Sequence, residues 1–393
     1  MEPICNRLLT DILSPWGITL PTWAIVSIAL LVALIAIYAA VSVNALFLIW
    51  LERKISGRIQ RRQGPMLCGP KCMAQKSMWL GGWIATVCDA VKLIFKEDII
   101  PSKVDKFGFI LAPIVVMLAA IAVYVPIPWS ATAYHQTERV TFAFADLNVG
   151  LLYIVAVPSL TVFSILTAGW SSNNKYSLLG GFRSVVQMLS YEIPMMFALM
   201  GPIILAGSLS LGDIVKAQIQ GLFGIPFLGW FIVPSFIGAI VYFICSIAES
   251  NRPPFDMPES EQELGTGFNT EYSGMRFAMF YLAEFSNAFV VSSIFTAVFL
   301  GGWSIPGFIP PAELHLGSLV IPYFDLLVGI VVFSVKAYAV LLILMWIRWT
   351  FVRVRPDHLM NFGWKFLLPL SIANVIICTV IAAVQQIYFG GLS

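Results

Sequence analysis

The strongest constraint on the fold of this chain is a series of long apolar segments. A helix needs about 20 apolar residues to cross a bilayer. Eight segments of about this length or longer cover residues 22–51, 107–128, 147–170, 185–207, 230–248, 275–301, 324–347 and 363–389. The first begins too far into the chain, and is too long, to be a cleaved signal peptide. We therefore predict an all-α integral membrane protein with about eight transmembrane helices.

The composition excludes most other classes of protein. Only 11% of the 393 residues are charged and 59% are hydrophobic, whereas soluble domains carry about 25% charged residues. A soluble enzyme, a nucleic-acid-binding protein and a disordered scaffold are excluded on these grounds. No segment remains for a soluble domain, so residues 1–393 are expected to form one membrane domain with long loops at 52–106 and 249–274.

The basic residues predict the orientation of the chain. Nineteen of the 23 Lys and Arg residues fall in the four connections that follow the odd-numbered segments, with the edges of their flanking segments. Three basic residues lie on the opposite side and Lys336 lies within a segment. Because basic residues stay on the cytoplasmic side, both termini are predicted to face outward and the four basic connections to be cytoplasmic.

An acid-rich stretch breaks this basic background. Residues 249–284 contain seven of the 21 acidic residues, balanced by only Arg252 and Arg276. A short helix opened by Pro258 would explain first-turn acids at 259 and 261 but not the whole group. Crowded carboxylates repel one another and exchange protons readily, so the stretch indicates a proton route. The seven residues are Glu249, Asp256, Glu259, Glu261, Glu263, Glu271 and Glu284.

Three ionisable residues fall inside predicted spans: Glu192, Glu284 and Lys336. Charged groups in a bilayer are costly unless they are paired or hydrated. A structural ion pair is the simpler interpretation of Lys336. The two glutamates lie at similar depth beside the acid-rich stretch, which favours a functional interpretation.

Residues 51–65 have the pattern of an amphipathic helix at the membrane interface. Apolar residues recur every four positions, and a second stripe of the helix is basic. The apolar stripe is Leu51, Ile55 and Ile59, and the basic stripe is Lys54, Arg58 and Arg61/Arg62. This pattern is typical of a lipid-headgroup anchor. Farther on, Asp89, Lys92 and Lys96 share one helical face.

No metal centre is apparent in the sequence. The six cysteines are scattered apart from Cys68 and Cys72, and the three histidines lie outside the apolar segments. This distribution matches neither a zinc, a haem nor an iron–sulfur ligand set.

Five motifs are similar to one known family. They are ERKxxGxxQxRxGP at 52–65, DxxKLxxKE at 89–97, AGWSSNNKYSLLGGFRS at 168–184, SYE at 190–192 and NRPPFDMPESEQELGTGFNTEYSGMRFAMFYLAEF at 251–285. The chain resembles the quinone-proximal membrane subunit of respiratory NADH:quinone oxidoreductase (complex I), which is subunit 1 in mitochondria and the H-type subunit in bacteria. The likeness resumes at Lys336 and continues through RPDHLMNFGWKFLLPLSIAN.

The resemblance implies a redox-silent subunit whose cytoplasmic loops form the membrane side of a quinone channel. Residues carried over to that channel are Glu52, Arg53, Gln60, Arg62, Asp89 and Tyr272. Residues carried over to a proton and coupling route are Glu192, Glu249, Asp256, Glu259, Glu261, Glu263, Glu271 and Glu284. Quinone would be the substrate. NADH, FMN and iron–sulfur clusters would belong to partner subunits, both hydrophilic quinone-site subunits and small membrane subunits.

Two alternatives remain open from the sequence. The chain could serve a related complex that oxidises ferredoxin, F420H2 or hydrogen, since it would not touch the electron donor. A stand-alone secondary transporter would be a different class, although no internal repeat supports it. We expect a bacterial plasma membrane rather than a mitochondrial one, with ubiquinone, menaquinone or plastoquinone as the quinone. Residues 1–21, the extra length near 66–88 and residues 305–323 have no assigned role.

Overall fold

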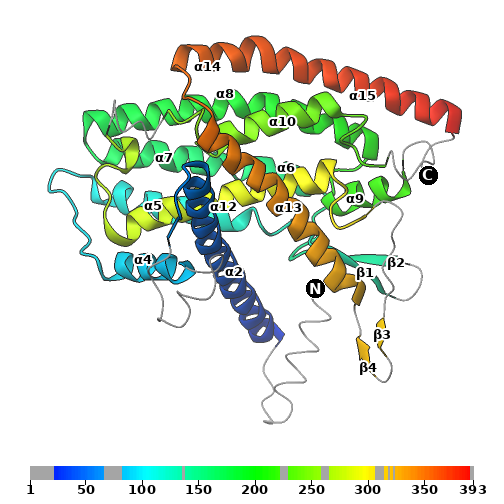
Figure 1. The fold of residues 1–393 in the computed structure, drawn as a ribbon, viewed down its shortest axis with the longest axis horizontal. Coiled ribbons are helices and arrows are strands. Elements are labelled where there is room, and N and C mark those ends of the chain that lie inside the picture. Colours follow the sequence, from blue (N-terminus) through cyan, green and yellow to red (C-terminus); the bar gives the residue numbers. More distant parts are fainter. Residues whose placement is uncertain are drawn as a thin grey trace.

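The computed structural model describes residues 22–65, 82–134, 138–221, 229–257, 265–305, 314–316, 319–321 and 324–389. Helices fill most of this part of the chain (Figure 1). The helices are α2 (Thr22–Ile59), α4 (Trp83–Phe95), α5 (Lys106–Ala122), α6 (Gly150–Ala156), α7 (Ser159–Ser171), α8 (Lys175–Ala206), α9 (Leu211–Gln220), α10 (Phe236–Glu249), η3 (Gly267–Asn269), α12 (Gly274–Phe299), α13 (Phe324–Thr350), α14 (Pro356–Phe362), η4 (Gly363–Leu367) and α15 (Leu368–Phe389).

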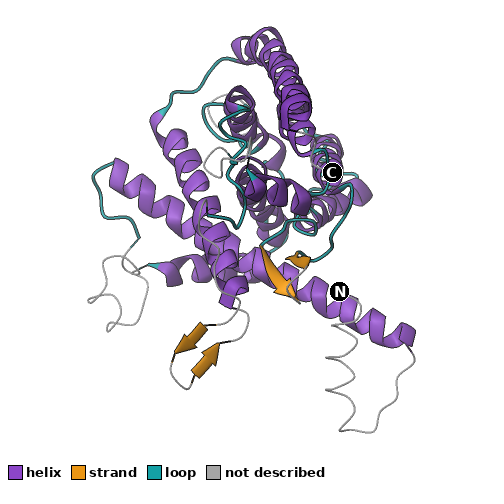
Figure 2. Ribbon diagram, turned by 90° about the vertical axis from the view of Figure 1, so that its right-hand side faces the viewer, coloured by secondary structure: helices purple, strands orange, loops and turns teal. Residues whose placement is uncertain are grey.

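Within the described ranges, the strands form two small antiparallel hairpins. One joins β1 (Ser130–Tyr134) to β2 (Glu138–Phe142), and the other joins β3 (Leu314–Leu316) to β4 (Leu319–Ile321). Figure 2 shows how little of the molecule they occupy. The all-α fold class predicted from the apolar segments is therefore confirmed.

Each of the eight predicted spans contains a helix. Five helical stretches among the described residues are long and apolar enough to cross a membrane: Gly150–Ser171, Lys175–Ala206, Gly274–Phe299, Phe324–Thr350 and Pro356–Ile387. Two shorter apolar helices, α5 and α10, lie in the second and fifth predicted spans. The chain is a membrane protein by these lengths and compositions.

The first predicted span and the predicted interfacial helix form a single helix. α2 runs for 38 residues, through the first span and into the predicted interfacial helix as far as Ile59. Helix-favouring residues occupy the junction, with Leu51, Glu52, Arg53 and Lys54 in sequence, so nothing separates the two parts. The helix ends at Ile59, and Arg61 in the following turn adopts a positive φ of 55° ahead of the Gly64–Pro65 pair.

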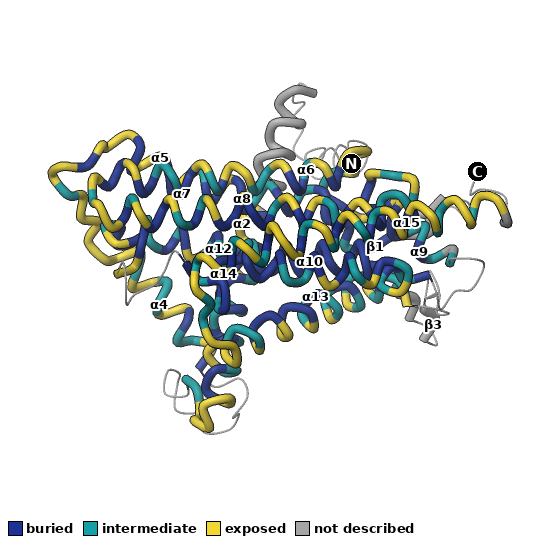
Figure 3. Tube along the Cα trace, turned by 90° about the horizontal axis from the view of Figure 1, so that it is seen from above, coloured by how far each residue is buried: buried dark blue, intermediate teal, exposed yellow. Residues whose placement is uncertain are grey.

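α12 is the central helix of the molecule. It contacts α2, α5, α10 and α13, and 89% of its most apolar stretch is buried, against 28% for α13 and 22% for the last helical stretch. The dark tube at the centre of Figure 3 shows the same burial. Polar residues on α12 are therefore inside the protein, away from surrounding lipid.

Two buried clusters surround α12. The larger one joins α2, α8, α10, α12 and α13, with Leu48, Tyr242 and Phe333 among its fully buried members. The smaller one joins α5 and α7 to the start of α12 around Phe109, Phe268 and Phe280. In Figure 1, α2 and α13 run away from α15 toward the opposite side of the molecule. The rings of Phe47 on α2 and Tyr338 on α13 meet at 5.6 Å between centroids.

Candidate functional site

A cavity of about 800 Å³ lies between α2, α4, α12 and the end of α13. Its wall on α2 follows one stripe from Tyr38 to Ser56, which spans roughly 27 Å at 1.5 Å per residue. Apolar and aromatic groups line much of the cavity, and charged groups gather near the C-terminal end of α2. Its lining residues include Tyr38, Ser42, Leu46, Ile49, Glu52, Arg53, Ser56, Arg62, Ala90, Leu93, Tyr281, Leu282, Phe285, Arg348 and Trp349.

An ion pair joins α2 to α4 at the charged end of the cavity. Arg53 Nη1 lies 2.6 Å from Asp89 Oδ2, and both side chains are about half exposed, at 46% and 49%. Both residues line the cavity. Because solvent screens an exposed pair, its contribution to stability is small, roughly 0–1 kcal/mol. The pair connects α4 to α2 beside the cavity.

A buried carboxylate forms the inner part of the charged end. Glu52 lies between Arg348, which pairs with Oε1, and Arg252, whose Nη1 is 3.7 Å from Oε2. The side chains of Glu52 and Arg252 are 8% and 6% exposed. Arg252 also stacks over the Phe285 ring at 4.7 Å. Removing Glu52 would take from both arginines the carboxylate that pairs with them.

Arg348 is a site residue that the sequence interpretation missed. In the sequence, Arg348 is one of the basic residues that predict the orientation, and a basic residue at the cytoplasmic end of a span is ordinary. A clue lay in the buried-charge rule, because a buried Glu52 needs a cation. The identity of that cation could not be deduced from spacing, since Arg348 is distant in the sequence.

Four of the six residues predicted for a quinone channel line this cavity, namely Glu52, Arg53, Arg62 and Asp89. Gln60 lies just beyond α2, is exposed and does not line it. Tyr272 is not among the lining residues either. The structure thus brings together residues from two distant motifs.

Tyr272 belongs to the smaller buried cluster. Its ring stacks on Phe109 at 4.0 Å between centroids, and its hydroxyl donates to the Phe109 carbonyl at 3.3 Å. Burial raises the pKa of the Tyr272 phenol, so it remains protonated at neutral pH. The neighbouring Glu271 accepts a hydrogen bond from Asn174 Nδ2 at 2.8 Å. Tyr272 and Glu271 are therefore held by different partners.

Two of the predicted acids meet inside the helix bundle. Glu249, at the end of α10, and Glu284, on α12, both line a small cavity of about 20 Å³ together with Asn251 and Asn287. Glu249 also experiences the charge of Glu192 on α8. Glu249 therefore lies near carboxylates of two other helices, Glu192 of α8 and Glu284 of α12.

The other predicted acids are less closely grouped. Asp256 is half-buried in the turn after α10 and has interactions of its own. Glu271 is held at the start of α8 by its hydrogen bond from Asn174. Glu259, Glu261 and Glu263 lie outside the described residues.

Residues of α12 and of the turn after α10 separate the two cavities and form a partition between them. Phe285 lines the large cavity and Glu284 the small one, although they are neighbours on α12. The same relation holds in the turn after α10, where Asn251 lines the small cavity and Arg252 contacts Glu52 of the large one. The Glu52–Arg252 contact with Phe285 forms this partition.

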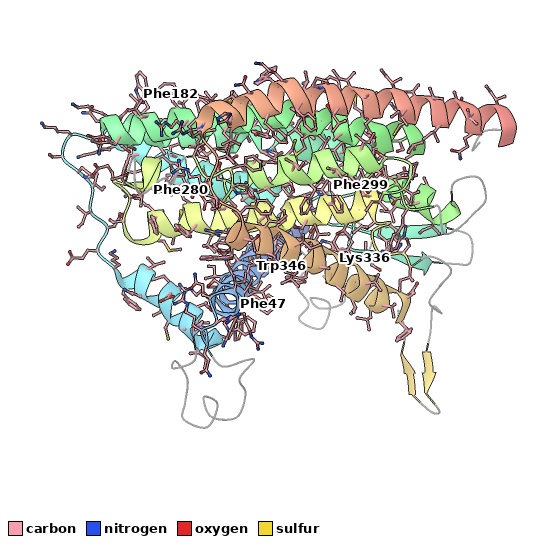
Figure 4. The ribbon with its side chains drawn as sticks, turned by 45° about the horizontal axis from the view of Figure 1, so that its top comes forward. Phe47, Phe182, Phe280, Phe299, Lys336 and Trp346 are labelled. Atoms are coloured by element: carbon pink, nitrogen blue, oxygen red, sulfur yellow. The ribbon has the colours of Figure 1, made fainter. Side chains whose placement is uncertain are left out.

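The contacts of Lys336 differ from the structural ion pair that the sequence predicts for it. Its ammonium donates to the carbonyls of Leu300, Gly302 and Ser304 at 2.8, 3.1 and 2.5 Å. It also lies 4.6 Å from the centre of the Trp230 ring. Figure 4 shows Lys336 on α13 near Phe299, the last residue of α12. A cation at a helix C-terminus is favourable, so Lys336 joins α13 to the end of α12.

Within the described residues, no group of three or more His, Cys, Asp or Glu residues is arranged to hold a metal ion. The groups that this site offers for chemistry include carboxylates, guanidinium groups, amides, tyrosine hydroxyls and the ammonium groups of Lys92 and Lys96. They can bind polar headgroups and exchange protons.

These features define a class of protein. It is an α-helical membrane protein with a large amphiphilic cavity at one end of its helix bundle and further carboxylates inside the bundle. The NADH dehydrogenase family matches residues 31–379. H-type subunits of NADH-quinone oxidoreductase are similar over most of the chain. Those of Dehalococcoides mccartyi strain CBDB1 and Brevibacillus brevis are 43% and 40% identical over 350 and 381 residues, which cover 89% and 97% of this chain and 86% and 98% of theirs. An H-type subunit of Geobacter metallireducens is 40% identical over 369 residues, covering 91% of this chain and 96% of its own length.

The chain therefore belongs to the family of H-type subunits of NADH-quinone oxidoreductase. It is a membrane subunit of that enzyme, complex I, as the five motifs indicated.

Proposed function

We propose that the large cavity is the membrane side of a quinone channel and that the carboxylates inside the bundle form a proton and coupling route. The observation that carries this proposal is the cavity between α2 and α4, long and apolar along α2 and charged where α2 ends. A quinone has a polar headgroup with two carbonyl acceptors and a long apolar tail. The charged end of the cavity has hydrogen-bond donors for the headgroup, and its wall along α2 is apolar and suits the tail.

The arginines at the charged end suit a carbonyl headgroup. Arg53 and Arg62 line the cavity, and a guanidinium group presents several donors in a fixed plane. Asp89 holds Arg53 in place through the 2.6 Å pair. The headgroup would pass these residues on its way to a neighbouring hydrophilic subunit.

The carboxylates inside the bundle support the second half of the proposal. Glu249 and Glu284 line one small cavity, and Glu192 influences Glu249 electrostatically. Carboxylates so close together cannot all hold a negative charge without cost, so they share protons. The proposed route consists of Glu192, Glu249, Asp256, Glu259, Glu261, Glu263, Glu271 and Glu284.

The partition between the cavities is the proposed coupling element. A quinone headgroup near Glu52 would change the electric field at Arg252, and Arg252 adjoins Asn251 in the wall of the acidic cavity. Charge changes in one cavity would thereby alter proton binding in the other.

The remaining parts of the proposal concern the assembly. Hydrophilic quinone-site subunits and small membrane subunits would be the partners, and NADH, FMN and the iron–sulfur clusters would lie in those partners. The chain would span a bacterial plasma membrane with both termini on the outer side, as the basic residues predict.

Filling the cavity tests the proposed channel. Ala90 lines the cavity on α4, whereas Ala85, one and a half turns earlier on the same helix, does not. In the purified complex, Ala90→Phe should raise the KM for a short-chain quinone about tenfold or more, equivalent to about 1.4 kcal/mol of lost binding. Ala85→Phe should leave it nearly unchanged. Equal KM values for the two variants would show that quinone does not pass through this cavity.

A further inference from the structure

A second small cavity adjoins the acidic one. Its volume is about 10 Å³, and its wall includes Tyr242 of α10. It shares two polar residues with the first small cavity, Glu249 and Asn287. These two side chains therefore lie between the cavities.

The two cavities follow one stripe of α12. Phe280, Ala283, Glu284 and Asn287 line the first. Asn287, Val290, Val291 and Ile294 line the second. Residues spaced by three, four and seven positions share one face of a helix. The centre of the second cavity is thus farther along α12, with Asn287 at the boundary.

The size and polarity of both cavities suit water. A buried water needs a volume of about 10–15 Å³ for its centre and two to four polar partners. Glu249 Oε2 is buried and has no hydrogen-bond partner among the described residues. The Tyr242 hydroxyl donates to the Val291 carbonyl at 3.2 Å, so its oxygen can still accept. The Asn287 amide lines both cavities and offers two donors and an acceptor.

We propose that each small cavity holds one ordered water and that Asn287 is a positioning residue joining the two waters across Glu249. This branch extends the acidic route from Glu284 and Glu249 toward Tyr242, and it rests on the proposed proton route. Asn287 does not ionise at neutral pH. Its NH2 group donates to one water and its carbonyl accepts from the other, which orients both toward the carboxylates.

Proton exchange through the first water is balanced. The water accepts a proton from the protonated member of the Glu249 and Glu284 pair and gives another proton to the ionised member. One proton moves between the carboxylates and the water is unchanged. The Tyr242 hydroxyl, already donating to Val291, only anchors the second water.

The substitution Asn287→Leu tests this role, because leucine is of similar size and has no hydrogen-bonding group. In the assembled complex, proton uptake coupled to quinone reduction should fall about tenfold, the size of effect expected when a buried hydrogen-bonding group is removed. Asn287→Ser restores a donor and an acceptor and leaves room for another water, so it should recover most of the rate. Ser286→Ala is the matched control, because the Ser286 hydroxyl donates to Leu282 of its own helix at 2.7 Å.

Two further measurements separate this proposal from the proton route itself. A high-resolution structure of the complex should show one water in each cavity, and Asn287→Leu should remove both. Tyr242→Phe should remove only the water of the second cavity. Dry cavities, or full proton uptake in Asn287→Leu, would overturn the role of Asn287. If Glu249→Gln is also without effect, the route fails; if Glu249→Gln impairs uptake, the route stands without Asn287.

Discussion

Individual side chains at the charged end of the large cavity differ in what they contact. Glu52 is buried between two arginines, Arg53 is held by Asp89, and Arg62 lines the cavity from the turn after α2. Arg58, also on the basic stripe, does not line it. The basic stripe is therefore divided between residues that face the cavity and residues that do not.

This division predicts different effects for two conservative substitutions. Arg62→Lys keeps the charge but loses the planar fork of donors, so the KM for a short-chain quinone should rise by about tenfold to a hundredfold, as expected for one charge-assisted hydrogen bond. Arg58→Lys should have little effect. Steady-state kinetics of the purified complex measure both. If Arg62→Lys and Arg58→Lys both change the KM only slightly, the basic stripe is only a lipid-headgroup anchor.

The carboxylates within the bundle give a second prediction at this scale. Glutamine keeps the shape and hydrogen bonding of glutamate but cannot carry the proton. Glu192→Gln and Glu284→Gln should each impair quinone-coupled turnover and proton uptake in reconstituted vesicles while the complex still assembles. Normal rates in both variants would make these residues structural polar groups.

The packing of helices against loops depends on close backbone contacts. Gly180 on α8 faces η3, and a Cβ at Gly180 would lie 2.8 Å from the Gly267 Cα. Ser177, one turn earlier on α8, donates to the Phe268 carbonyl at 3.3 Å. These contacts hold the end of the acid-rich loop against α8.

Gly180→Ala should therefore push η3 away from α8. Overpacking of this kind costs about 1–3 kcal/mol, which should lower the thermal stability of the complex and its coupled activity. Gly181→Ala is the adjacent control, since its Cβ would meet its nearest neighbour, the Ile165 carbonyl oxygen, at an ordinary 3.4 Å. Thermal unfolding of the two variants compares them directly, and equal stability would contradict a required contact at Gly180.

Elements were easier to predict from the sequence than their contacts. Long apolar runs are sufficient to locate helices in a membrane protein, because the backbone must satisfy its own hydrogen bonds there. The continuity of α2 was missed because the change from apolar to charged residues resembled an interface boundary. The partners of Glu52 and Lys336 could not be predicted, since both depend on helices distant in sequence. Tyr272 was assigned to the channel by the resemblance, whereas its ring stacks on Phe109 within the smaller buried cluster.

On the scale of the whole molecule, α12 separates two kinds of interior. One side of the helix faces the large cavity through Tyr281 and Phe285. Another side faces the two small cavities through Glu284 and Asn287. A central helix that lines both kinds of cavity can transmit a change of charge in the large cavity to the small cavities without carrying electrons itself.

A redox-silent subunit makes a simple prediction about the isolated chain. Six cysteines and three histidines without a ligand pattern should give no iron and no visible absorption from haem or clusters. Metal analysis and absorption spectroscopy of the purified subunit check this expectation. Stoichiometric iron in the isolated chain would contradict it.

Cross-linking with a photoreactive quinone tests the proposed channel most directly. A quinone carrying the reactive group on its headgroup would be irradiated in the intact complex, and the labelled peptides of this chain would be mapped. We expect labels within residues 49–62, 86–96 and 275–285, and an excess of unlabelled quinone should suppress them. Labelling confined to lipid-facing residues of α15, or labelling that excess quinone does not reduce, would contradict a quinone channel between α2, α4 and α12.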